Sequence, residues 1–102
     1  MQTANTLQLN NNYKTIYLSD LYPIGKRLSR AELDLLRTDA EKKALWATTN
    51  DGTKVIRYFC DETDSVSFTI ILPTGERIAA MMGSCPKGVD RRLWAEIKRH
   101  SK

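Results

Sequence analysis

Three strand-like segments that follow one another with short links constrain the fold of this chain most. Residues 54–60 are rich in β-branched and aromatic side chains, and residues 66–72 alternate apolar with hydroxyl-bearing side chains. Residues 77–82 follow after the turn-forming sequence Pro-Thr-Gly-Glu at 73–76. Because parallel neighbours need a crossover of about a dozen residues or more, these short links predict an antiparallel meander.

A helix is predicted to start directly after Ser29. Ser29 and Glu32 form the S/T-x-x-E pattern of a capping box, in which each side chain accepts a hydrogen bond from the other residue's backbone amide. A second such pattern begins at Thr38, so the segment is either one helix of residues 30–47 or two short helices broken near Thr38, and we favour one. The sequence Asn-Asp-Gly at 50–52 predicts a turn after it.

The two ends of the chain differ in pattern. Residues 1–12 are polar and uncharged, and we expect a flexible leader there. Residues 14–19 alternate weakly and predict a first strand. Towards the other end, Val89, Leu93 and Ile97 share one face of a predicted C-terminal helix.

These elements predict an α+β fold with the order β-α-β-β-β-α. We expect one small domain over residues 13–102, with an antiparallel sheet of about four strands and both helices packed on one of its faces. The total length of 102 residues matches a single domain. No apolar run approaches the roughly 18 residues that a membrane helix needs, and we expect no membrane partner.

The positive charge is concentrated at the C-terminal end. The chain has a net charge of +4, and residues 87–102 account for all of it with six basic and two acidic residues. Such a segment suits an anionic partner, and equally suits the negative end of a helix dipole. A second basic cluster lies at residues 26–30.

The leading hypothesis is a small, basic, non-enzymatic nucleic-acid-binding or regulatory protein that needs no cofactor. Its partner would be DNA or RNA, bound through phosphates in a salt-sensitive way, or an acidic protein surface. The expected phosphate contacts are the basic side chains of both clusters: Lys26, Arg27, Arg30, Arg91, Arg92, Lys98 and Arg99. Aromatic side chains that offer a further interface are Tyr13, Tyr17, Tyr22 and Trp94.

Two other functions are compatible with a small α+β fold of this kind. One is a protein–protein interaction module, such as a small inhibitor, adaptor or antitoxin-like factor, with exposed aromatic and methionine side chains as hot spots. The other is a small RNA-cleaving toxin, by analogy of fold alone. A free sheet edge or helix face would also allow a homodimer.

Few residues of the chain could catalyse a reaction or bind a metal ion. Cys60, Cys85 and His100 show none of the paired spacings of a structural zinc site, so we expect no metal. His100 lies close to the C-terminus, where a base is poorly held beside a nucleophile. Two cysteines in a chain without secretion features indicate reduced thiols and a cytoplasmic location.

One short motif carries an enzymatic alternative. Residues 85–91 read Cys-x-x-Gly-x-x-Arg between a predicted strand and a predicted helix. This resembles the phosphate-binding loop of cysteine-dependent phosphatases, which implies Cys85 as nucleophile and Arg91 as phosphate ligand. Ser84 and Arg92 stand where that family usually has His and Ser or Thr, and Pro86 removes one amide donor.

Overall fold

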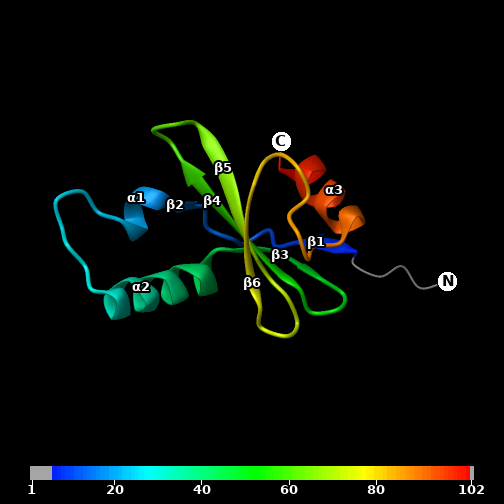
Figure 1. Ribbon diagram of the computed structural model, residues 1–102, viewed down its shortest axis with the longest axis horizontal. Coiled ribbons are helices and arrows are strands. Elements are labelled where there is room, and N and C mark those ends of the chain that lie inside the picture. The colour runs from blue at the N-terminus through cyan, green and yellow to red at the C-terminus, as the bar shows by residue number, and fades with distance from the viewer. Residues whose placement is uncertain (1–5, 102) are drawn as a thin grey trace.

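The computed structural model describes residues 6–101, which form a mixed α+β fold around an antiparallel sheet (Figure 1). In chain order its elements are β1 (Leu7–Leu9), β2 (Ile16–Tyr17), α1 (Leu18–Leu21), α2 (Arg30–Lys43), β3 (Leu45–Thr49), β4 (Lys54–Cys60), β5 (Ser65–Ile71), β6 (Arg77–Met81) and α3 (Arg91–His100). The strands lie in the order β1-β3-β4-β5-β6, and β2 pairs with β4 in parallel. The predicted α+β class and the antiparallel meander are confirmed.

The meander β4-β5-β6 keeps an unbroken register. Val55 lies opposite Ile70, and Phe68 opposite Ala80, so alternate residues of the three strands share one face. The predicted turn at 50–52 joins β3 to β4. There the Asp51 carboxylate accepts hydrogen bonds from the backbone amide and hydroxyl of Thr53, at 3.1 and 2.9 Å.

The two longer helices contribute to separate cores on opposite faces of the sheet. Val55, Phe68 and Ile70 pack with Leu93 and Ile97 of α3. The alternate β4 residues, Ile56 and Tyr58, pack instead with Ile16, Leu21 and Ala44 beside α1 and the end of α2. The expectation that both helices cover one face is therefore wrong, because β4 is apolar on both of its faces.

Helix α2 begins as predicted and ends earlier than predicted. Both hydrogen bonds of the capping box are present, from Glu32 N to Ser29 Oγ and from Ser29 N to Glu32 Oε1. The helix is continuous through Thr38, whose hydroxyl donates to the Asp34 carbonyl at 2.8 Å. Residues 45–49 form β3 rather than helix. Pairing with β1 and β4 buries Trp46 and Ala47. This burial outweighs the helical spacing of Ala47 from Ala44.

The N-terminal segment contributes more than expected. Residues 1–5 of the predicted leader lie outside the described part of the chain, but residues 7–9 form β1 and pair with β3. Leu7 is buried against the core. Of the predicted strand at 14–19, only residues 16–17 pair in the sheet, and residues 18–21 form α1. The fold therefore has six strands and three helices among its described residues, rather than four and two.

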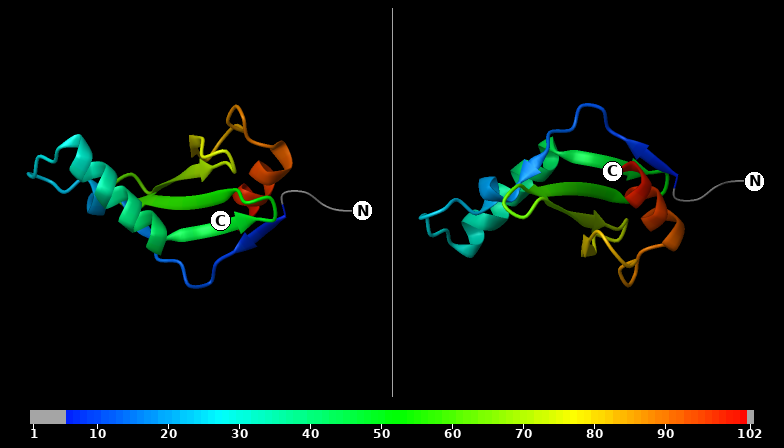
Figure 2. Two further views of the ribbon diagram at one scale, coloured as in Figure 1. Left: turned by 90° about the horizontal axis from the view of Figure 1, so that it is seen from below. Right: turned by 90° about the horizontal axis from the view of Figure 1, so that it is seen from above.

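The described part of the molecule is longer in one direction than in the other two (Figures 1 and 2). Helix α2 extends away from the sheet, and together with α1 and the loop between them it forms one end of the molecule (Figures 1 and 2). Helix α3 lies at the other end (Figure 2). Within residues 6–101, no helix is long and apolar enough to cross a membrane.

Candidate nucleic-acid interface

Helix α3 is fixed to the sheet by an apolar side and a capped N-terminus. Leu93, Trp94 and Ile97 are buried in the core beside Val55 and Phe68. The Asp90 carboxylate accepts hydrogen bonds from the amides of Arg92 and Leu93 at 2.8 and 3.2 Å, as an N-cap does. The orientation of α3 is therefore set by apolar packing, which leaves its charged side outside.

The outer side of α3 carries its cations. Arg91, Arg92 and Arg99 are exposed, whereas the Lys98 ammonium donates to the Gly83 carbonyl at 3.0 Å. Glu96 opposes this charge locally: Arg99 Nη2 lies 2.6 Å from its carboxylate. The hydrogen bond from Arg99 lowers the pKa of Glu96, so this carboxylate stays ionised at neutral pH. Arg91 and Arg92 have no ion pair with any described residue and are the cations most open to a phosphate.

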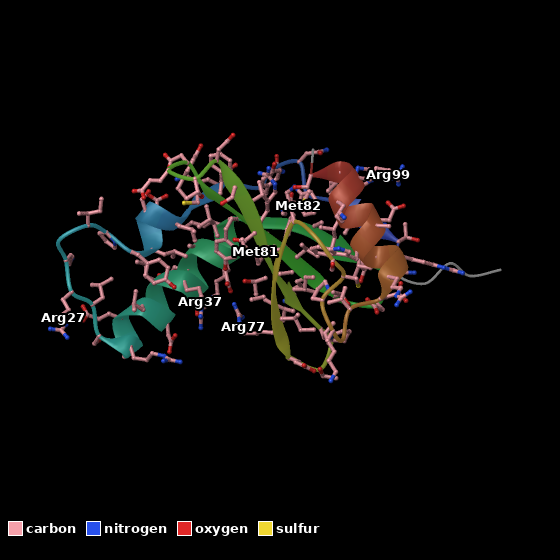
Figure 3. The ribbon with its side chains drawn as sticks, turned by 45° about the horizontal axis from the view of Figure 1, so that its top comes forward. Arg27, Arg37, Arg77, Met81, Met82 and Arg99 are labelled. Atoms are coloured by element: carbon pink, nitrogen blue, oxygen red, sulfur yellow. The ribbon has the colours of Figure 1, made fainter. Side chains whose placement is uncertain are left out.

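The second basic cluster lies at the far end of the molecule. Lys26 and Arg27 are exposed on the loop between α1 and α2, and Arg30 begins α2. Figure 3 shows Arg27 and Arg99 at opposite ends of the structure. Glu32 lies in the same first turn and stays ionised, because the hydrogen bond from the Ser29 amide lowers its pKa. The fold thus keeps the two predicted basic clusters apart.

The four aromatic side chains proposed as an interface differ in exposure. Tyr22 is 58% exposed, and Tyr17 is exposed but packs edge-on against Phe59 with ring centroids 5.9 Å apart. Tyr13 is half-buried against the core. Trp94 is only 4% exposed, and its indole Nε1 donates to the Gly83 carbonyl at 3.0 Å. Trp94 therefore anchors α3 and offers no surface for a partner, which corrects its place among the interface residues.

In the loop that resembles a phosphatase motif, the cysteine side chain faces backbone carbonyl groups. The Cys85 thiol is half-buried against the core and donates to the Val89 carbonyl, with Sγ 3.3 Å from that oxygen. A phosphate-binding loop instead directs amides towards the thiolate. The first amides of α3, at Arg92 and Leu93, already bind the Asp90 carboxylate. This geometry favours a structural role for the loop.

An open groove, not expected from the sequence, lies over the sheet face beside α1 and α2. Its volume is about 620 Å³, and its walls include Tyr22 directly after α1, Arg37 of α2 and Met81 of β6. Hydroxyl side chains of β5 line its floor together with Tyr58. The alternating Ser and Thr residues of β5 are the sequence signal that this face has a polar floor.

A charged network around the buried Glu41 carboxylate lies beside the groove. Tyr58 donates to Glu41 Oε2 at 2.5 Å, and Arg77 Nη2 lies 2.5 Å from both oxygens of the same carboxylate. Burial, aided by the hydrogen bond to Glu41, raises the pKa of Tyr58 to about 12. Tyr58 is therefore neutral at physiological pH and cannot serve as a base there. No local sequence pattern predicts this network, because its three members lie far apart in the chain.

Among residues 6–101, no group of three or more His, Cys, Asp or Glu side chains is placed to hold a metal ion. Comparison with protein-family models, with curated proteins and with solved structures finds no match to this chain.

Proposed function

We propose that this chain is a small nucleic-acid-binding module that contacts phosphates through the outer side of α3. The observation that carries this proposal is the division of α3 into two sides. Its apolar side is buried in the sheet core, and its exposed side carries Arg91, Arg92 and Arg99. Arginine side chains on a helix that is fixed to the core suit phosphate oxygens, to which a guanidinium group donates in a fixed fork geometry.

Binding of this kind is driven by release of counterions and carries little base specificity. The indole of Trp94 is buried and offers no surface for base stacking. We therefore expect similar affinity for different sequences of one strand type. As part of the same proposal, we place the protein in the cytoplasm, where reduced Cys60 and Cys85 and a nucleic-acid partner are compatible.

The test is fluorescence anisotropy with short single- and double-stranded DNA and RNA, from about 50 to 200 mM salt, the range over which phosphate contacts weaken steeply. The double variant Arg92→Gln/Arg99→Gln should bind more weakly. The slope of log K against log salt should become shallower by about 0.9 for each duplex phosphate that the variant no longer neutralises.

The matched control is Lys26→Gln/Arg27→Gln, which removes the same charge at the other end of the molecule. It should change affinity much less than the α3 variant. If both variants lower affinity equally, binding follows net charge and the assignment to α3 is wrong. If none of the four nucleic acids binds at the lowest salt, the proposal fails, and an acidic protein surface becomes the partner to examine for α3.

A further inference from the structure

Strand β6 forms an open edge of the sheet. It pairs with β5 from Arg77 to Met81, and no other strand of residues 6–101 lies on its outer side. Apart from its pairing with β5, no hydrogen bond within residues 6–101 involves the backbone of β6, so its outward amides and carbonyls are available to a further strand. Exposed edges of this kind are sites of strand addition unless the protein protects them.

The opposite edge of the sheet is protected in ways that β6 is not. Strand β1 has only three residues, and α3 packs beside it. Natural proteins also protect edges with charged side chains. The one charged side chain of β6, Arg77, instead points across the sheet face and binds Glu41 of α2. Beyond Arg77 the strand presents small Ala79 and Met81, which is 67% exposed (Figure 3).

The side-chain pattern of β6 fits a second copy of itself. In an antiparallel pair centred on Ala79, each Ala79 faces its symmetry mate and each Arg77 faces Met81 of the other copy. Arg77, Ala79 and Met81 share the α2 side of the sheet, because side chains alternate along a strand. The small residue thus lies on the two-fold axis, flanked by long side chains, and no like charges stand opposite each other.

We propose that the chain forms a homodimer by antiparallel pairing of β6 with β6 of a second copy. The sheets of the two copies then join into one continuous sheet, and Met81 of each copy covers the aliphatic part of Arg77 in the other. The two-fold axis of an antiparallel pair stands perpendicular to the sheet. Both α3 helices therefore lie on one face of the dimer and both α2 helices on the other.

The oligomeric state of the full chain tests this proposal. Light scattering coupled to size exclusion, over about a hundredfold range of protein concentration, should show twice the monomer mass of 11.6 kDa at the upper end. Ala79→Lys places two ammonium groups on the axis and should give a monomer. Met81→Lys should weaken the dimer as well, and circular dichroism should show that both variants stay folded, since both sites are exposed.

The matched control is Leu35→Lys, which adds the same charge at an exposed leucine of α2 that is 67% accessible. It should leave the dimer intact. A monomer at every concentration overturns the proposal, and so does a dimer that persists in folded Ala79→Lys, because it must use another surface.

A disulfide tests the register independently of stability. The Cα atoms of directly opposed residues in an antiparallel pair lie about 4.5–5.5 Å apart, within the range that a disulfide spans. Ala79→Cys should therefore form a cross-linked dimer rapidly under mild oxidation. Ile24→Cys, at a position 90% exposed, and the wild-type chain with its two cysteines should do so far more slowly. Equal rates for Ala79→Cys and Ile24→Cys would contradict the register.

Discussion

Arg77 of β6 and Glu41 of α2 form an ion pair across the sheet face, with Arg77 Nη2 2.5 Å from each carboxylate oxygen. Glu41 is the buried partner, at 8% side-chain exposure, whereas Arg77 is 40% exposed. The same carboxylate accepts a hydrogen bond from the hydroxyl of Tyr58 in β4. This network fastens the last turn of α2 to two strands, while the earlier turns extend away from the sheet.

Replacing Arg77 should measure how much the Arg77–Glu41 ion pair contributes to the free energy of unfolding. Arg77→Met leaves Glu41 buried with only Tyr58 as a partner, so we expect a loss of about 2 kcal/mol, less than for a fully buried pair because Arg77 is partly exposed. Urea denaturation measures this. The control Arg37→Met removes the exposed pair with Asp34 and should cost less than about 1 kcal/mol. Equal losses in the two variants would show that the Glu41 pair has no special role.

Tyr58 should make the protein sensitive to alkaline pH. Its pKa is raised from 10.0 to about 12 in the folded state by burial and by the hydrogen bond to Glu41. The folded state therefore holds this proton more tightly than the unfolded state does. The resulting stability is fully present below pH 10 and is lost as the pH rises towards 12.

The difference in unfolding free energy between wild type and Tyr58→Phe, followed across this pH range, isolates the effect from other tyrosines. The advantage of the wild type should shrink steadily as pH increases. A difference that does not change with pH would show that Tyr58 has the same pKa in the folded and the unfolded protein.

Two glycines with the same backbone geometry should differ in their response to alanine. Gly75 and Gly88 both have φ of +93°, but a Cβ at Gly75 meets open space, whereas at Gly88 it would lie 3.2 Å from Ile78 Cδ1. We expect Gly75→Ala to cost about 1 kcal/mol from backbone strain. Gly88→Ala should cost about 2 kcal/mol, since Ile78 must also shift. Thermal or urea unfolding of both variants distinguishes strain from packing, and a smaller cost at Gly88 would contradict the tight contact.

Two substitutions of Asp90 should distinguish its contribution to the stability of α3 from the effect of its negative charge on nucleic-acid binding. Asp90→Ala loses the hydrogen bonds to the amides of Arg92 and Leu93, and should cost about 1 kcal/mol. Asp90→Asn keeps an N-cap of similar strength and removes one negative charge beside the proposed phosphate contacts. We expect Asp90→Asn to bind nucleic acid more tightly than wild type at low salt, as measured by anisotropy. Weaker binding by a folded Asp90→Asn would argue against phosphate contacts near the start of α3.

Elements with strong local signals were predicted well from the sequence. The capping box of Ser29 and Glu32 specifies the start of α2 through hydrogen bonds between residues three apart. The alternation in residues 66–72 and the turn at 73–76 predicted the hairpin of β5 and β6 within one or two residues. The apolar side of α3 was predicted equally well, although Trp94 proved to be fully part of it.

The wrong predictions of secondary structure share a physical cause. Leu45 to Thr49 has helix-compatible spacing, yet it forms β3, because pairing on both of its sides and burial of Trp46 stabilise a strand there. Residues 7–9 look like a polar leader until β3 supplies the partner that makes them a strand. The β1–β3 pairing joins residues that lie far apart in the chain, so no local pattern reveals it.

Local patterns were enough to predict the class of fold, the meander, the capped helix start and the amphipathic C-terminal helix, because each depends on contacts between near neighbours. Packing between distant segments set which sheet face each helix covers, and it brought Arg77 to Glu41, which leaves the β6 edge unprotected. It also decided that the two basic clusters lie at opposite ends of the molecule. These relationships join residues far apart in the chain, and their energies arise only when the folded sheet brings the partners together.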